Sequence, residues 1–299
     1  MGGNKRVGFV RAAATVAAVV GLLGMRAAIA ATKFELKPDV PETAAQTLVS
    51  GLIKVVVVPQ KSSEKDSPEY TVNYQVFYNN VLKLKRSVTT WIMGTVELKD
   101  LDRNAAPEVV VSTYTGGAHC CTEYTIHGWQ KSKFTTAETG PLDSGGGQFQ
   151  DLDGNGTLEF LSVDNAFLYA FDSYAGSFPP TRIYEYKAGK LVNTTRQYPK
   201  VLRARAWEMY KTLQQNPKEA ASFNGVLAGY VAQKVLLGEY KQGWDLMLAR
   251  YDRKSDWGLE IYKGGQVIGK HPDFPTALKA FLIGTGYLDK TGKPIAVDR

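Results

Sequence analysis

The sequence predicts a mainly β protein with a helical C-terminal part, that is, an α+β chain. Three observations lead to this prediction. Apolar residues alternate strictly over residues 70–78, which is the period of a half-buried strand. An Asp-Leu-Asp segment occurs at Asp100 and again at Asp151, with strand-like residues on both sides. After Pro199 the apolar period changes to that of a helix.

The first 30 residues have the layout of a secretory signal peptide. Basic residues precede an apolar run over residues 12–24, and Ala28-Ile29-Ala30 offers a small-residue cleavage site. The run is shorter than the roughly 20 apolar residues that a spanning helix needs. We therefore expect cleavage after Ala30 and a periplasmic or secreted chain with no membrane span. An uncleaved anchor is the alternative. A short polar lead follows over residues 32–45.

The charge of the mature chain argues against a nucleic-acid partner. The full sequence has 36 Lys and Arg against 29 Asp and Glu. Removing the four basic residues of the signal peptide leaves 32 against 29, a surplus of only 3. There is also no basic stripe interleaved with aromatic residues, which nucleic-acid binding would favour.

The first strands follow the polar lead. Residues 52–58 are β-branched and predict a strand that ends at Pro59. The alternating segment 70–78 predicts a second strand. Asn79-Asn80 is a turn signal, and residues 81–85 return as the partner of a hairpin.

An internal repeat covers the next hundred residues, in copies of about 94–144 and 145–196. The two Asp-Leu-Asp cores are 51 residues apart, from 100 to 151. Each copy predicts a strand, an acidic loop, a strand and two further strands. Four short strands in 40 to 50 residues are typical of a propeller blade, although two copies cannot close a propeller. We expect a β domain over 31–196 made of blade-like antiparallel repeats.

A small helical domain is predicted over 197–299. Apolar stripes of helical period occupy residues 202–213, 226–235 and 244–251, and a last helix is expected over 275–288. Residues 259–267 are ambiguous, but Gly264-Gly265 favours a small hairpin.

The second acidic loop has the composition of a calcium site. Calcium prefers six to eight hard oxygen ligands, and alternate residues of a tight loop can direct side chains to one point. A twelve-residue EF-hand is excluded because its last position would be Ser162, which has no carboxylate. A turn that binds nothing is the alternative, because Asp, Asn and Gly favour turns. The expected ligands are the side chains of Asp151, Asp153, Asn155 and Glu159 and the carbonyl of Thr157.

This loop, set between two strands, resembles the calcium loops of integrin-type (FG-GAP) β-propeller repeats. The resemblance implies that the same five residues ligate calcium. The first loop keeps the spacing with Asp100, Asp102, Asn104 and Glu108. Arg103 and Ala105 stand where the second loop has glycines, so we expect weaker calcium binding there, or a degenerate copy that remains as a turn.

The most unusual segment is Gly116-Gly117-Ala118-His119-Cys120-Cys121. Together with the acidic loops and Tyr198-Pro199, it resembles a group of uncharacterised exported bacterial proteins, and this resemblance implies no activity. Adjacent cysteines in an oxidising compartment favour a vicinal disulfide. A soft-metal site with His119, a cysteine nucleophile with a histidine base, and two reduced buried thiols are the alternatives.

We therefore expect an exported, non-catalytic, calcium-binding structural or interaction protein. Its partner would be another protein or an envelope polymer. The alternative is an exported hydrolase that acts on envelope polymer or carbohydrate, with an acidic site drawn from Asp164, Asp172 and Glu185 near the aromatic run of residues 169–186.

Overall fold

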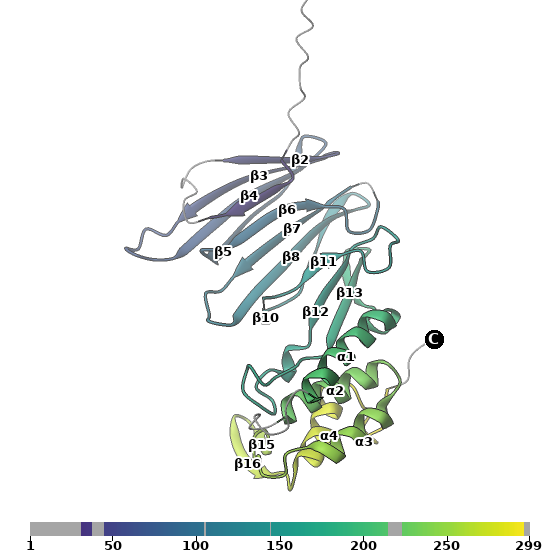
Figure 1. Cartoon of the computed structure of the whole chain (residues 1–299). Coiled ribbons are helices and arrows are strands. Elements are labelled where there is room, and N and C mark those ends of the chain that lie inside the picture. The colour runs from purple at the N-terminus through teal and green to yellow at the C-terminus, as the bar shows by residue number, and fades with distance from the viewer. Residues whose placement is uncertain (1–30, 38–44, 105, 144, 215–222, 296–299) are drawn as a thin grey trace, which may run out of the picture.

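The computed structural model describes residues 31–37, 45–104, 106–143, 145–214 and 223–295. The predicted signal peptide, residues 1–30, lies outside this part of the chain. Antiparallel sheets are the main regular structure, with 41% of the residues in strands, and the helices gather in the C-terminal part (Figure 1), which confirms the predicted fold class. The sheets do not close into a barrel.

The N-terminal sheet, here called sheet B, is a meander of four strands. Its second and third strands bury alternate residues. The predicted hairpin is confirmed as the antiparallel pair of the third and fourth strands, which turns at Asn79-Asn80. One boundary was wrong, because the strand expected to end at Pro59 continues to Lys61. Pro59 pairs with Val72 of the third strand of this sheet, so the proline is accommodated inside the strand. The strands are β2 (Gln46–Ser50), β3 (Ile53–Lys61), β4 (Glu69–Tyr78) and β5 (Val81–Trp91).

Sheet A contains the first repeat copy and one strand that sequence analysis missed. The predicted polar lead, residues 32–45, contains a strand whose Phe34 and Leu36 are only 1% and 3% exposed. Two apolar residues are too short a pattern to predict a strand. The order is β1-β6-β7-β8-β10, and β9 also pairs with β8. The strands are β1 (Lys33–Leu36), β6 (Gly94–Lys99), β7 (Glu108–Tyr114), β8 (Cys120–Gln130), β9 (Lys133–Glu138) and β10 (Leu142–Asp143).

Sheet C is the second repeat copy and pairs its four strands in sequence order. The first copy pairs β6 to β9 in the same consecutive way, so each copy supplies the four strands that the repeat predicted. The strands are β11 (Gln148–Gln150), β12 (Glu159–Val163), β13 (Thr181–Lys187) and β14 (Lys190–Asn193), with short 3-10 turns at Asn165–Phe167 and Thr195–Gln197.

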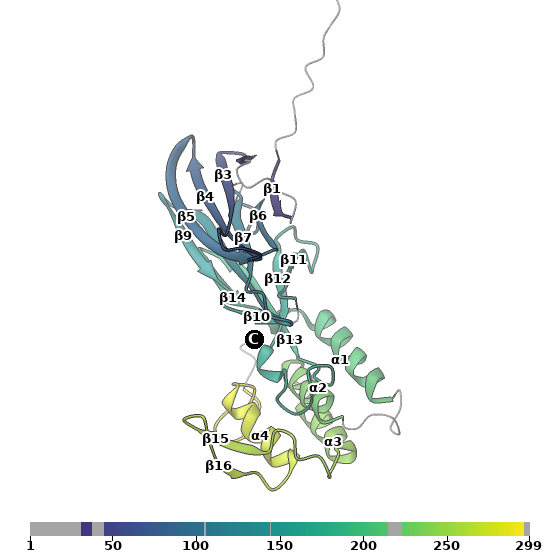
Figure 2. The same ribbon diagram turned by 90° about the vertical axis from the view of Figure 1, so that its left-hand side faces the viewer.

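The three sheets form two cores. The inner face of sheet A packs on sheet B, with Phe34, Val96 and Val111 facing Val55 and Tyr74 in one buried cluster. Residues of the opposite face of sheet A, such as Val110 and Ile126, join a second cluster with residues of sheet C, such as Tyr186. Figure 2 shows β5 and β9 on one side of the β unit and β11 and β12 on the other.

A buried histidine connects sheets A and B. His127 is 1% exposed, and its Nε2 lies 2.8 Å from the Tyr74 hydroxyl. Its Nδ1 lies 2.9 Å from the Thr136 hydroxyl. Burial, with a smaller contribution from the charge of Arg86, lowers the pKa of His127 to about 4.

This pKa predicts a loss of stability in acid. The unfolded chain binds a proton at His127 below about pH 6.5, whereas the folded chain does not until about pH 4. The free energy of unfolding should therefore fall by about 2–3 kcal/mol between those pH values. Urea unfolding of the wild type and of His127→Gln at pH 7, 5.5 and 4.5 isolates this contribution. Equal pH slopes for the two proteins would contradict it.

The C-terminal part packs its helices around α2. All thirteen residues of α2 are buried, and two of its glycines, Gly225 and Gly229, lie against the backbone of residues 176–178. The predicted hairpin around Gly264-Gly265 is confirmed. The last helix is shorter than predicted and ends at Gly284. The elements are α1 (Pro199–Gln214), α2 (Asn224–Leu236), α3 (Tyr240–Arg250), β15 (Glu260–Lys263), β16 (Gln266–Lys270) and α4 (Phe274–Gly284). None of the described helices combines the length and apolar character needed to cross a bilayer.

Buried polar contacts join sheet C to the helices. The Gln233 side chain of α2 accepts a bond of 2.9 Å from the backbone N–H of Thr181 and donates one of 3.0 Å to the carbonyl of Leu202. Asp164 accepts bonds from Arg182 at 2.6 Å and from the Tyr287 hydroxyl at 2.9 Å. The β and helical parts are therefore joined by these hydrogen bonds as well as by the connecting chain.

Candidate metal centre

The two acidic loops occupy equivalent places in the two repeat copies. One connects β6 to β7 and the other connects β11 to β12. In the first loop, carboxylate oxygens of Asp100, Asp102 and Glu108 lie within 4.8 Å of one another. In the second, those of Asp151, Asp153 and Glu159 do the same. The structure thus brings together the carboxylates that the sequence placed in each candidate site.

Matching hydrogen bonds give both loops the same internal frame. The glutamate of each loop accepts a backbone bond across the turn, from Leu101 to Glu108 at 2.9 Å and from Leu152 to Glu159 at 2.8 Å. The asparagine side chain of each loop accepts a bond from the backbone N–H two residues later, at 2.8 Å for Asn104 and 2.7 Å for Asn155. The 51-residue sequence repeat is therefore also a repeat of local structure.

Backbone conformation distinguishes the two loops. Gly154 has a φ of 79°, and Arg103, at the equivalent position, has a φ of 61°. Glycine adopts this left-handed region freely, whereas arginine pays about 1–2 kcal/mol for it. The first loop therefore makes the same bend at a higher conformational cost, for the reason that the glycine difference predicted. Ala105 lies outside the described residues.

In the second loop, Asp151 is already surrounded by donors. Its carboxylate accepts backbone bonds of 2.7 Å from Gly154 and 2.9 Å from Gly156, and a longer one from Asn155. Desolvation raises the pKa of Asp151, but these N–H groups outweigh it and the pKa lies below its ordinary value. Asp151 is therefore held as a carboxylate at neutral pH.

In the first loop, Glu108 has an unpartnered buried oxygen. Glu108 and Glu159 are both fully buried. The Oε1 of Glu159 accepts a bond of 3.0 Å from the Thr157 hydroxyl. The equivalent of Thr157 in the first loop is Ala106, which has no hydroxyl, and Oε1 of Glu108 has no partner.

The unpartnered Oε1 of Glu108 indicates whether the first loop fits a cation. Burial raises the pKa of Glu108 to about 8, and the nearby Asp102 adds to the rise. A buried carboxylate without a partner needs a proton or a cation. Asp100, Asp102 and Glu108 supply hard oxygens of the kind that calcium prefers. The residues of the first loop therefore also fit a cation. The sequence difference between Thr157 and Ala106 in the aligned repeats could have predicted that Glu108 lacks the partner that Glu159 has.

Arg103 does not lie over its own carboxylates. Its guanidinium donates to the backbone carbonyl of Asn155 in the second loop. A backbone bond of 3.0 Å from Leu158 to Leu101 also joins the loops. The positive charge of Arg103 therefore lies against the second loop and not over the carboxylates of the first.

The Gly-Gly-Ala-His-Cys-Cys segment lies at the other end of β7. Cys120 and Cys121 are joined as a vicinal disulfide, and the turn is closed by backbone and hydroxyl bonds between Thr115 and Cys121 of 3.0 and 2.7 Å. His119 is exposed and stacks on Tyr174 with ring centroids 4.1 Å apart. This stacking was not predicted, because the two rings come from segments 55 positions apart.

We expect the disulfide in the protein purified without reductant from the cells that make it, because the cysteines are adjacent and the export that the sequence predicts would lead to an oxidising compartment. Intact mass without reductant should be two hydrogen atoms below that of the dithiol. Free alkylation of both cysteines in the folded protein would contradict this prediction.

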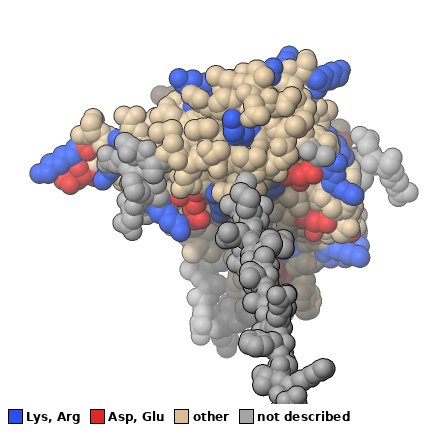
Figure 3. All heavy atoms as spheres, turned by 90° about the horizontal axis from the view of Figure 1, so that it is seen from above, with Lys and Arg blue, Asp and Glu red and all other residues tan. Residues whose placement is uncertain are grey.

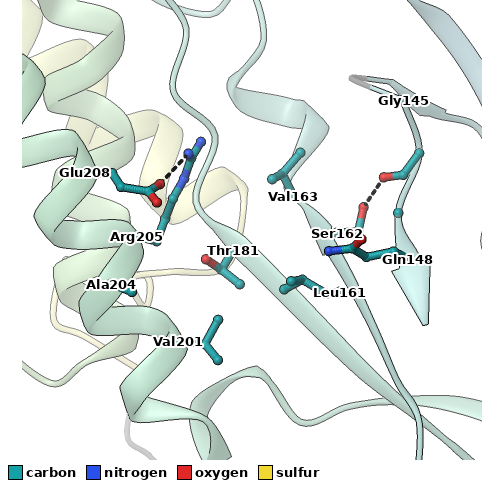
Figure 4. A pocket seen from close by; sticks show the side chains of 12 residues that line it. Gly145, Gln148, Leu161, Ser162, Val163, Thr181, Val201, Ala204, Arg205 and Glu208 are labelled. Carbon is teal, nitrogen blue, oxygen red and sulfur yellow. Dashed lines mark hydrogen bonds and ion pairs between the residues drawn. The ribbon is translucent and has the colours of Figure 1, made fainter. Parts of the chain in front are cut away.

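The other candidate groups have structural partners. His127 is bonded between Tyr74 and Thr136. Among the carboxylates considered for a hydrolase, Asp164 is bonded to Arg182, and Glu185 accepts a bond of 3.1 Å from Tyr198. A cavity of about 470 Å³ lies between α1 and sheet C (Figure 4). Its charged residues, Arg205 and Glu208, pair with each other at 3.2 Å.

Comparison with known proteins gives relatives but no assigned activity. Residues 202–286 match the family described as the sll0997 C-terminal domain. The probable thylakoid lumen protein sll0997 of Synechocystis sp. is 36% identical over 220 residues, which are 70% of this chain and 65% of that protein. The uncharacterized protein y4bJ of Sinorhizobium fredii is 34% identical over 241 residues, 74% of this chain and 38% of that protein.

These figures establish homology to sll0997. The chain spans 65% and 38% of the lengths of these two relatives. The thylakoid lumen, which the name of the first relative gives as its probable location, is topologically similar to the periplasm. No solved structure matches.

Proposed function

We propose that this homologue of sll0997 is an exported, non-catalytic interaction protein whose β unit is stabilised by calcium in its two acidic loops. The observation that carries the proposal is the buried, unpartnered Oε1 of Glu108 beside Asp100 and Asp102. Calcium would be held by these residues in the first loop, and by Asp151, Asp153 and Glu159 in the second. A bound cation neutralises carboxylates that otherwise repel one another.

The position of the loops explains how calcium would stabilise the fold. Each loop begins where one strand ends and closes onto a glutamate at the start of the next strand. Leu101 and Leu158, inside the loops, pack into the cluster between sheets A and C. Ordering the loops would therefore also hold these two sheets together.

The surface and the compartment support an interaction role. In the view from above, at the β2 end, Lys, Arg, Asp and Glu lie scattered over a mostly uncharged face (Figure 3). Such a surface favours a neutral partner over a polyanion. The predicted signal peptide and the probable lumen location of the relative both support export.

Calcium titration of the mature protein tests the proposal. A hundredfold excess of calcium over its Kd should stabilise the fold by about 2.7 kcal/mol for each occupied loop and raise the thermal midpoint. Magnesium should raise the midpoint less, because it loses its water reluctantly. Asp102→Ala and Asp153→Ala should each lose part of the rise, and the double variant should lose it all.

Matched variants separate calcium binding from a general effect of charge. Glu64→Ala removes an exposed carboxylate from another loop and should keep the full rise. The single variants also show which loop binds calcium more tightly. The conformational freedom of Gly154 favours the second loop, whereas the unpartnered oxygen of Glu108 favours the first. An unchanged midpoint and no binding heat for the wild type, after chelation and reloading, would refute the proposal.

A further inference from the structure

A second candidate site lies on the face of sheet A that also packs on sheet C, at the end away from the acidic loops. Glu108 and Lys99, next to the first loop, lie at one end of the β6–β7 pair, and Gly94 and Thr113 lie at the other end. There a hollow of about 540 Å³ is bordered by β1, β6, β7 and the turn that carries His119. Its volume lies within the range of small-molecule sites.

A prearranged aromatic platform forms one wall. The His119 and Tyr174 rings are stacked at an angle of 18°, and the Tyr174 hydroxyl donates a bond of 3.0 Å to Asp143. The turn that carries His119 is closed by the disulfide and by the bond between Thr115 and Cys121. Gly116 of this turn lies against the Trp91 indole ring, so closely that a Cβ at this position would overlap the ring. Neither ring belongs to a buried core cluster, and the Tyr174 ring also contacts the Tyr169 ring, with centroids 5.5 Å apart.

Hydroxyl groups form the floor. Thr95 and Ser112 are bonded to each other at 2.8 Å, and Thr122 and Glu35 also line the hollow, with the Glu35 carboxylate paired to Lys33 at 3.7 Å. Hydroxyls donate and accept, so they match the hydroxyls of a sugar. Glu35 is the only acidic residue in the described lining, and that lining contains no Lys or Arg. The chemistry therefore suits a neutral ligand better than an anion.

We propose that this hollow binds a neutral oligosaccharide, with one sugar ring against the His119–Tyr174 platform and its hydroxyls on Thr95, Ser112 and Thr122. The proposal deepens the interaction role proposed above by naming a glycan as the envelope polymer. The cavity beside α1 suits this ligand less well, because its described lining has no aromatic residue on which a sugar ring could stack (Figure 4).

Calorimetric titration with soluble oligosaccharides of four to six sugars tests this site. We expect binding of a neutral series, from β-linked glucose or N-acetylglucosamine oligomers, and weaker binding of galacturonate oligomers. His119→Ala should weaken binding by about tenfold. Thr122→Val should weaken it while leaving the aromatic platform in place. Trp207→Ala, which removes a 58% exposed aromatic residue from α1, should leave it unchanged.

Three results would overturn the proposal: no binding of any neutral series, wild-type affinity in both His119→Ala and Thr122→Val, or loss of binding in Trp207→Ala alone. The calcium-dependent midpoint measured on the same variants separates the two proposals. If His119→Ala keeps the calcium response and no oligosaccharide binds, the glycan site fails while calcium binding stands.

Discussion

Gly229→Ala should destabilise the chain by about 3 kcal/mol or more, at the upper end of the range for overpacking. An ideal Cβ at Gly229 would overlap the carbonyl oxygen of Phe178. Because that oxygen belongs to the backbone and α2 is buried on every side, neither partner can turn away. Thermal or urea unfolding of the purified protein measures the loss.

Gly284→Ala is the matched control. Gly284 is also helical, but its Cβ would meet nothing within 4 Å. Alanine is favoured over glycine inside helices by up to about 1 kcal/mol, so this variant should be neutral or slightly more stable. Similar stability of the two variants would show that α2 does not lie against residues 176–178 as described.

Phe34→Ala should cost about 3–5 kcal/mol, the usual loss for a large aromatic residue removed from a core. Phe34 is 1% exposed, pairs with Val96 and packs in the cluster between sheets A and B. Urea unfolding measures the change. Lys33→Ala alters the exposed neighbour in the same strand and should stay within about 0.5 kcal/mol of wild type. A small effect of Phe34→Ala would mean that β1 is dispensable for the fold.

The regular elements could be predicted from sequence where their patterns are long. The alternation over residues 70–78 and the helical stripe after Pro199 both correspond to observed elements, β4 and α1. The strand at Phe34 was missed because four residues contain too few periods to stand out. Pro59 was read as a strand end because proline is usually excluded from the middle of a sheet, and its pairing with Val72 depends on contacts that local sequence does not show.

The candidate metal site shows a similar division. The spacing of Asp100, Asp102 and Glu108 was enough to predict that their carboxylates would cluster. The direction of Arg103 could not be predicted, because its acceptor lies in the other repeat copy. The stack of His119 on Tyr174 likewise depends on how the β10 region places residue 174 beside the disulfide turn.

The register of β1 also has a consequence for the order of folding. Lys33 pairs with Glu97, so the first strand to be synthesised waits for a partner that arrives after sheet B is complete. The strands β2 to β5 pair with their sequence neighbours and can form early, whereas pairing over a long sequence separation is slow. In a chain synthesised from its N-terminus, Phe34 and Leu36 would therefore stay exposed until β6 is available. Transient exposure of such apolar residues favours aggregation, so β1 is the strand most at risk before sheet A forms.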